Sequence, residues 1–379
     1  MLILAAILAI FVYGVIAAMF GTIIPALAKK FLLSDMQAGF IFTAQALGMT
    51  IASISVGPLI DNKGKKPALL LGLGLVAAAL YGLANASGYE MTVMFAVVLG
   101  VGGGIIVTGA NALVSDINPQ KRGSVMNGLN LFFGLGGLVT PLLASDLLGG
   151  DPVKLAYFAA ILTTVTLAVH FGTKMPAPTG ERGFKASEMS ALLSQPVLYL
   201  LAGFLFLYVA AEVGVWNWLA KHLIAQGLSE ASALRILSLG FALGILLGRV
   251  AVAPVLIKVP APTVTLASSV LMAITTYAML QTNDPTMAGV AVFFAGIAMA
   301  PVFPTTLAMV GDAFPKATAT AMGIVITSGW IGLLVSSPII GSVASSSGLR
   351  TALLILPAFS VLMIVINVIM RPMLKKKLA

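Results

Sequence analysis

Glu212 is the only acidic residue that lies well inside a long apolar segment, here residues 195–220. A charged carboxylate is costly in such surroundings, so it must be protonated, paired or in contact with water. Three roles fit: coupling to a proton or sodium ion, accepting hydrogen bonds from ligand hydroxyls, or a structural pair with Arg249. We predict that Glu212 couples a cation and contacts the ligand, with Arg249 as its partner.

Amide and aromatic side chains in other apolar segments suit a sugar-like ligand. A hexose needs donors and acceptors around its hydroxyls and an aromatic plane against its C–H surface. Asn127 and Asn130 are three residues apart and share a helix face. The alternatives are helix–helix hydrogen bonding for the amides, an interfacial position for Trp216, and a simple proline kink near Phe303. The predicted ligand-binding residues are Gln45, Asn111, Asn127, Asn130, Glu212, Trp216, Asn217, Phe303, Thr305 and Trp330.

A charged cluster, GPLIDNKGKKP at residues 57–67, lies between two uncharged stretches. Gly57 would let two helices pack closely, and Asp61 would lie against the positive N-terminus of a helix that begins near Thr318. A topology signal would explain the lysines but not the Asp-x-x-Gly frame, so we predict a gate contact. The predicted gating residues are Gly57, Asp61, Gly64, Lys65, Lys66, Asp116, Arg122 and Asp312.

Two charge pairs are expected at the same end of the molecule. Asp116 and Asp312 end two apolar segments, and each is followed within six residues by a basic side chain. We therefore expect Asp116 to pair with Arg122, and Asp312 with Lys316.

The composition places these residues in a membrane. Of 379 residues, 59% are hydrophobic and 9% charged, with a mean hydropathy of +1.07, whereas soluble domains carry roughly 25% charged residues. Ten-residue strands of alternating polarity are absent, which excludes a transmembrane β-barrel. The net charge of +9 comes from lysines and arginines in short loops, where they set topology and predict no nucleic-acid partner. Without cysteine, disulfides and thiolate sites are excluded.

Twelve apolar windows are long enough to cross a bilayer core of about 30 Å. The first is expected to be a helix and not a cleaved signal. The longest polar stretch, 174–194, divides the windows into two sets of six. The windows are 3–27, 36–60, 68–87, 91–115, 123–149, 154–173, 195–220, 231–256, 263–281, 287–311, 319–345 and 351–371.

The distribution of basic residues predicts the orientation. With an even number of spans both termini lie on one side, and that side collects fourteen of the 21 lysines and arginines. Cytoplasmic loops carry the excess of these residues. We predict a multi-pass protein of a bacterial-type inner membrane, with both termini and the central linker in the cytoplasm.

An internal repeat is visible at an offset of 196 residues. Aspartate and proline matches are informative in this composition, and together the matches span more than ninety residues. They predict two parallel six-helix halves, residues 1–173 and 195–379, joined by a linker at 174–194. The matches include Pro58 with Pro254, Asp116 with Asp312, Pro119 with Pro315, Met126 with Met322, and Gly136 with Gly332.

The loop GPLIDNKGKK resembles the signature between the second and third helices of the major facilitator superfamily. It departs from that signature at Asn62. Three segments resemble the fucose permease and glucose-type sugar symporter group: 108–137, 208–223 (YVAAEVGVWNWLAKHL) and 296–306 (GIAMAPVFPTT). Two acids that couple protons in that group are replaced here by Gly21 and Val107, so the mechanism cannot be transferred directly.

The resemblance implies an all-α polytopic fold and secondary transport of a sugar or similar metabolite by alternating access. Coupling to protons or sodium through Glu212, and uniport, all remain open. A multidrug or lipophilic-compound exporter is the alternative, because 18 methionines and 19 phenylalanines suit an adaptable cavity. No H-E-x-x-H or G-x-S-x-G motif is present, so we expect no enzyme activity. We also expect no cofactor or metal, and a monomer.

Overall fold

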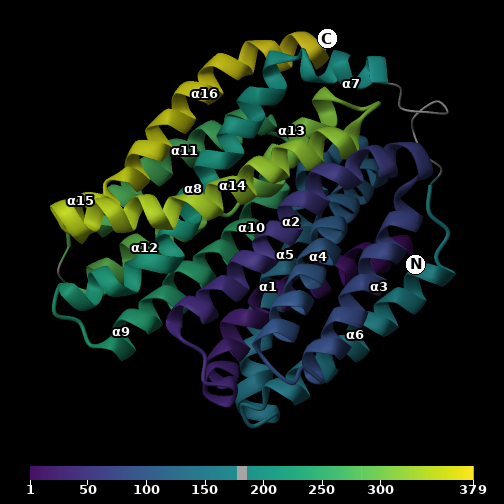
Figure 1. Cartoon of the computed structure of the whole chain (residues 1–379). Helices are drawn as coiled ribbons and strands as arrows, with labels where there is room; N and C mark the ends of the chain where they lie inside the picture. The colour runs from purple at the N-terminus through teal and green to yellow at the C-terminus, as the bar shows by residue number, and fades with distance from the viewer. Residues whose placement is uncertain (177–185, 283, 379) are drawn as a thin grey trace. The chain divides into compact units, whose positions relative to one another are not determined.

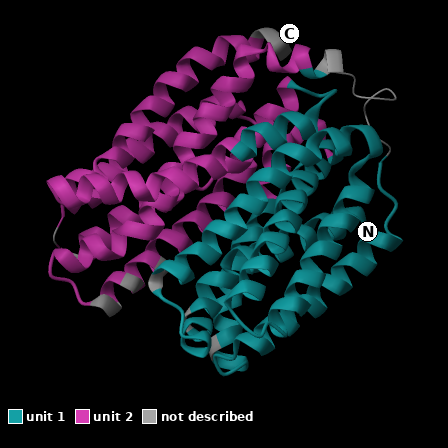
Figure 2. Cartoon of the chain, viewed as in Figure 1, with its two compact units in different colours: residues 1–117, 129–189, 314–327 teal, residues 118–128, 190–313, 328–379 magenta. Residues whose placement is uncertain are grey.

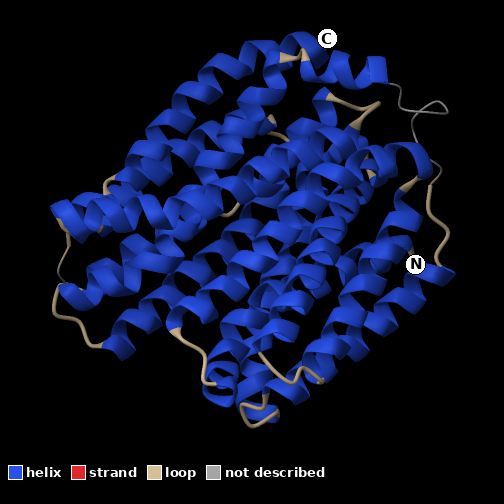
Figure 3. Ribbon diagram, viewed as in Figure 1, coloured by secondary structure: helices blue, strands red, loops and turns tan. Residues whose placement is uncertain are grey.

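Every element in the described part of the chain is a helix (Figure 3). The structure is a computed structural model that describes residues 1–176, 186–282 and 284–378. The predicted linker, 174–194, lies partly outside these residues. Eleven helical segments of the described residues are long and apolar enough to cross a membrane, and a shorter one covers Leu239–Val255. The predicted all-α polytopic architecture is therefore confirmed.

The first six windows correspond to six long helices, with short irregular helices at two of their ends. The loops are short, and a single residue, Gly64, separates α2 from α3 with a φ of 91°. The elements are α1 (Leu2–Phe31), α2 (Asp35–Lys63), α3 (Lys65–Ala84), α4 (Tyr89–Ile117), the 3₁₀ helix η1 (Pro119–Lys121), α5 (Arg122–Leu142), the π-helix η2 (Leu143–Leu147) and α6 (Pro152–Gly172).

The second set is more interrupted. Window 231–256 is divided among α9, a π-helix and α10, and window 287–311 breaks between α12 and α13. The elements are α7 (Ala186–Leu193), α8 (Pro196–Ala225), α9 (Glu230–Arg235), η3 (Ile236–Ala242), α10 (Leu243–Val255), α11 (Ala261–Met279), α12 (Pro285–Met299), α13 (Val302–Ala313), α14 (Thr318–Ser347), α15 (Leu349–Leu353) and α16 (Ile355–Leu378).

The break between α12 and α13 follows from two prolines. Pro301 and Pro304 have no N–H group, so the carbonyls four residues earlier lack their helical partners. One of these carbonyls belongs to Ala300, the residue that follows α12. It must find another donor, because an unpaired carbonyl is costly where no water is present.

The chain forms two compact units (Figure 2). Unit 1 comprises residues 1–117, 129–189 and 314–327, and within it α3 packs along α4 and α6 (Figure 1). Unit 2 comprises residues 118–128, 190–313 and 328–379, and within it α16 packs along α8 and α11. Each unit thus includes the start of one helix, α14 or α5, that the sequence assigns to the other half.

The two units repeat the same close helix contacts. An added Cβ on Gly48 would lie 2.4 Å from the carbonyl oxygen of Val97, and one on Gly244 would lie 2.3 Å from that of Phe293. Both members of the second pair are 196 residues beyond those of the first. In each unit, glycine is therefore required where the second helix of the repeat crosses the fourth.

Equivalent residues in the first helices of the two repeats, α1 and α8, are 195 positions apart. An added Cβ on Gly136 would lie 2.4 Å from the carbonyl oxygen of Phe11, and one on Gly332 would lie 2.5 Å from that of Phe206. These contacts align α1 with α8 residue by residue. The alignment identifies which side chains the two repeats share and which belong to one repeat alone.

Candidate functional site

The Asp61 carboxylate lies at the N-terminus of α14 in unit 1, where the sequence places it. Its Oδ1 accepts the N–H of Ala319 at 3.1 Å, and its Oδ2 accepts the N–H of Thr320 at 2.8 Å and the Thr320 hydroxyl at 2.6 Å. Asp61 is only 7% exposed. Free N–H groups and the helix dipole both favour a negative charge at this position.

Glycine makes this contact possible. An added Cβ on Gly57 would lie 2.5 Å from the Cα of Thr320, and one on Gly323 would lie 2.3 Å from the carbonyl oxygen of Ser53. Each of the two helices, α2 and α14, therefore presents a glycine to the backbone of the other. Any side chain at Gly57 would force them apart.

The two lysines at the start of α3 bind different partners. Lys65 is buried and forms an ion pair with Asp116 at the end of α4. Lys66 donates through Nζ to the carbonyl oxygens of Phe171 at 2.7 Å and Thr173 at 3.0 Å. It thereby satisfies carbonyls at the C-terminal end of α6, where a positive charge is favourable.

The two expected charge pairs, Asp116 with Arg122 and Asp312 with Lys316, were wrong. Asp116 pairs with Lys65, and Arg122 forms an ion pair with Asp312 inside unit 2. The reason is the path of the chain after α4: residues 118–128 leave unit 1 and pack in unit 2. Closeness in sequence therefore did not predict closeness in space, and Lys316 is an exposed residue.

Asn127 is bound to another helix in unit 2. Its Nδ2 donates to the Thr305 hydroxyl and to the Gly123 carbonyl oxygen, both at 2.9 Å. Its Oδ1 is buried and has no hydrogen-bond partner among the described residues. Of the two interpretations given for this residue, the structure shows the helix–helix hydrogen bond.

Asn111 and Asn130, the amide pair, lie together in unit 1. Asn130 Nδ2 donates to Asn111 Oδ1 at 3.2 Å, and Asn111 Nδ2 donates to the Val107 carbonyl oxygen at 2.8 Å. Both amides are buried. Gln45 is separate from them and donates to the carbonyl oxygen of Ile16 at 3.3 Å.

Glu212, Tyr208, Trp216 and Arg249 form a second group in unit 2, the carboxylate–guanidinium cluster. Glu212 is partly buried, interacts electrostatically with Arg249, and is approached by the Tyr208 hydroxyl and the Trp216 indole. The Tyr208 hydroxyl is fully buried, without a hydrogen bond of normal geometry to any described residue. Trp216 packs edge-on against Phe241, with ring centroids 5.1 Å apart.

Arg249 is held through the carbonyl that the proline break leaves without a helical partner. It is 4% exposed, and its Nε donates to the Ala300 carbonyl oxygen at 3.4 Å. Because Pro304 cannot donate to that oxygen, the contact satisfies Ala300 and fixes the orientation of the guanidinium.

The remaining predicted residues lie outside these groups. Asn217 is exposed and donates to the Ser337 hydroxyl at 2.8 Å, while Phe303 and Trp330 are partly buried. Tyr208 was not predicted, although its position four residues before Glu212 places both on one helix face. That spacing is a signal that could have identified it.

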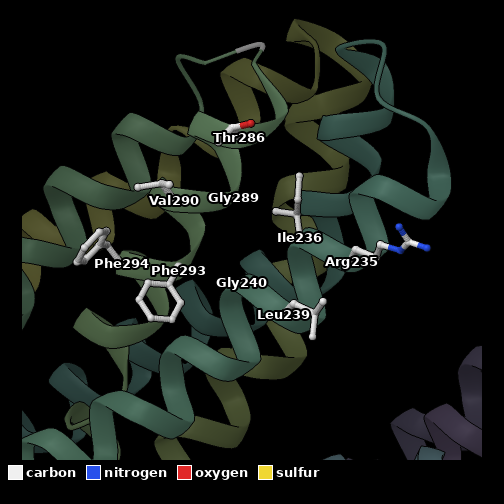
Figure 4. A pocket seen from close by; sticks show the side chains of 9 residues that line it. All are labelled: Arg235, Ile236, Leu239, Gly240, Thr286, Gly289, Val290, Phe293 and Phe294. Atoms are coloured by element: carbon white, nitrogen blue, oxygen red, sulfur yellow. The ribbon is translucent and has the colours of Figure 1, made fainter.

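A shallow groove in unit 2 contains none of the predicted residues. It has a volume of about 390 Å³ and lies between η3 and α12. Figure 4 shows its apolar lining, with Phe293 and Val290 on one side and Ile236 and Leu239 on the other. The Arg235 guanidinium points away from this lining (Figure 4). The polar clusters are therefore the better candidate site.

A family model described as the Major Facilitator Superfamily matches residues 6–258 and 224–378. The chain belongs to this superfamily. The Asp61 contact thus involves the segment GPLIDNKGKK, whose sequence resembles the superfamily signature.

Relatives and solved structures of the superfamily agree with this assignment. The chain is 23% identical over 356 residues to "Uncharacterized MFS-type transporter YfkL" of Bacillus subtilis, covering 89% of this chain and 88% of that protein. It is 24% identical to the gentisate transporter of Corynebacterium glutamicum, covering 62% and 56%. The structure of the E. coli fucose:proton symporter FucP matches with a TM-score of 0.83 and 18% identity, covering 97% and 98%. At that identity the likeness shows the fold alone.

Proposed function

We propose that this superfamily member is a secondary transporter that moves a sugar or a similar small polar metabolite by alternating access. The observation that carries the proposal is the carboxylate–guanidinium cluster within apolar helices. Charged side chains at such positions mark substrate or ion pathways, because their burial in lipid is costly. The amide pair supplies hydrogen-bonding groups of the kind that hydroxyls require. We also propose a monomer in a bacterial inner membrane with cytoplasmic termini.

Glu212 is the proposed coupling residue. The acids that the sugar symporter resemblance would place at Gly21 and Val107 are missing, and among the described spans Glu212 is the acid that lies far from both ends of its span, Pro196–Ala225. Binding and release of a proton or sodium ion at this carboxylate would couple its charge to the transport cycle. Uniport is the outcome if substrate uptake depends on neither ion.

A small hydroxylated aromatic acid is a second candidate substrate. One relative carries the name of a gentisate transporter, and the FucP structure is that of a fucose symporter. Arg249 offers a buried positive charge for a carboxylate, which a neutral sugar would not need.

Uptake into proteoliposomes tests the proposal. Labelled glucose, fucose and gentisate are supplied with an inward proton gradient, an inward sodium gradient, or neither. We expect one of them to accumulate under one gradient, and Glu212→Gln to abolish accumulation while exchange of substrate continues. Glu90→Gln is the control, since Glu90 lies exposed in the first turn of α4. Extrusion of a lipophilic cation, with no uptake of the three metabolites, would instead show an exporter.

A further inference from the structure

The hydrogen bond between Arg249 and the Ala300 carbonyl has an equivalent in the first repeat. The Ser53 hydroxyl donates to the Gly104 carbonyl oxygen at 3.5 Å, and Arg249 Nε donates to the Ala300 carbonyl oxygen at 3.4 Å. Both members of the second pair lie 196 residues beyond those of the first. A serine is therefore sufficient for this helix contact, and packing alone does not require a guanidinium.

Glu212 is also specific to the second repeat. The offset of 195 that relates α1 to α8 pairs Glu212 with Ala17, and pairs Tyr208 with Tyr13. The tyrosine is common to both repeats, whereas the acid and the base occur only in unit 2. The second repeat therefore has two costly charges that interact with each other and that the first repeat lacks at the equivalent positions, and the shared architecture explains neither.

The guanidinium is oriented before any ligand arrives. Its Nε is directed to the Ala300 carbonyl by the proline break, and the planar fork of arginine matches the geometry of a carboxylate. Trp216, which approaches Glu212, is 38% exposed and packs edge-on against the buried Phe241, so its ring face is available to a ligand. An aromatic face of this kind accepts either an aromatic ring or the C–H face of a sugar.

We propose that the transported metabolite carries one carboxylate, which binds Arg249 when Glu212 takes up a proton. The inference rests on the proposed transport function and specifies its substrate. In the empty site Arg249 and Glu212 balance each other, with Tyr208 and Trp216 as the other polar groups that approach the acid. A protonated Glu212 releases the guanidinium, and the substrate carboxylate then takes its place.

The exchange conserves charge. One proton binds the Glu212 carboxylate and one anion binds the Arg249 guanidinium, so the loaded site is as neutral as the empty one. Proton and monoanion therefore cross together without net charge movement. Transport should be faster when the source compartment is more acidic and should not respond to the membrane potential.

Matched acids and neutral analogues test the proposal in proteoliposomes that contain the full chain. Glucuronate is compared with glucose, and gentisate with 2,5-dihydroxybenzyl alcohol, so that the two sources of a carboxylate are distinguished. We expect one acid to be taken up at least about 100-fold faster than its neutral analogue, since a site built for a buried charge pair rejects the uncharged partner. Uptake should rise with external acidity and remain unchanged when valinomycin sets the potential.

Arg249→Ser places at position 249 the serine that forms the equivalent contact, Ser53 with Gly104, in the first repeat. This variant should therefore remain folded. It should lose uptake of the acid while retaining most of the thermal stability of the parent protein. Should this variant unfold because Glu212 is left without its partner, the double variant Glu212→Gln, Arg249→Ser removes both charges together. Arg249→Lys is expected to recover part of the uptake, since the charge is kept and the fork is lost.

The result separates this inference from the proposed function. Glucose or fucose uptake that equals or exceeds acid uptake, and survives Arg249→Ser, overturns the carboxylate while transport of a polar metabolite stands. Acid uptake that carries net charge overturns the one-proton, one-anion exchange. No uptake of any acid or sugar overturns both proposals.

Discussion

The Asp61 carboxylate receives two hydrogen bonds from one residue, Thr320, at 2.8 Å from its backbone nitrogen and 2.6 Å from its hydroxyl. The two residues are 259 positions apart in the chain. A contact of this kind at a helix N-terminus contributes about 1–2 kcal/mol in partly buried settings. Its loss should shift an opening equilibrium by roughly five- to thirtyfold.

Asp61→Asn keeps the shape of the side chain but removes the charge. The parent chain has no cysteine, so a single Ala319→Cys reporter gives an unambiguous labelling signal. Ala319 is fully buried, and we expect thiol reagents to label it faster in the Asp61→Asn background. Asp151→Asn is the matched control, because Asp151 caps its own helix through Val153 and Lys154. Equal labelling in both backgrounds would contradict a gate at Asp61.

Gly57→Ala should weaken the contact between α2 and the start of α14 because the added methyl group needs space there. No charge is changed. Its Cβ would lie 2.5 Å from the backbone of Thr320, and backbone cannot move aside as a side-chain tip can. Overpacking of this kind costs about 1–3 kcal/mol. We expect a lower melting temperature and reduced transport. Gly74→Ala is the control, because an added Cβ there meets nothing within 4 Å.

Reversal of the Arg122–Asp312 pair tests the partners that the structure assigns. Arg122→Asp or Asp312→Arg alone places like charges together and should lower the transport rate by about tenfold or more. The double variant restores opposite charges and should recover part of that loss. If Lys316 were the partner of Asp312, then Lys316→Asp would reduce transport as severely as Arg122→Asp. We expect Lys316→Asp to leave the rate nearly unchanged.

Asn127 and Asn130 should respond differently to truncation. Asn127 donates to Thr305 on another helix, so Asn127→Ala should chiefly lower the melting temperature, by a loss of about 1 kcal/mol. Asn130 belongs to the amide pair proposed to bind substrate, so Asn130→Ala should raise KM. Thermal unfolding and initial uptake rates, measured on both variants, check this. A raised KM in Asn127→Ala alone would reverse the two assignments.

Sequence patterns predicted most of the fold because a membrane restricts the alternatives. Segments of about 20 apolar residues must be helical to satisfy their backbone groups. The offset of 196 predicted two parallel halves but no contacts; the structure adds that equivalent pairs touch at this offset, such as Gly48 with Val97 and Gly244 with Phe293. The break of window 231–256 at η3 was not predicted, since a π-helix leaves no pattern in hydropathy.

For the candidate site, the sequence predicted chiefly which residues belong to it, and few of the contacts between them. Rare polar residues in apolar segments are conspicuous, so Glu212, Arg249 and the amides could be identified from the sequence. Glu212 with Arg249, and Asp61 with the start of α14, were predicted to meet. The other pairings could not be identified, because their partners are tens to hundreds of residues apart. Arg122 bonding to Asp312, and Asn127 to Thr305, depend on the start of α5 packing in unit 2.

The sequence by itself determined that the chain is a helical membrane protein with a duplicated design, and which side chains are costly enough to require a purpose. The tertiary structure decided which of these side chains meet and what each one contacts. The physical reason is that burial in lipid is a local property of a segment, readable from composition. Pairing depends on how helices pass one another, and helix crossing is set by packing across the whole bundle.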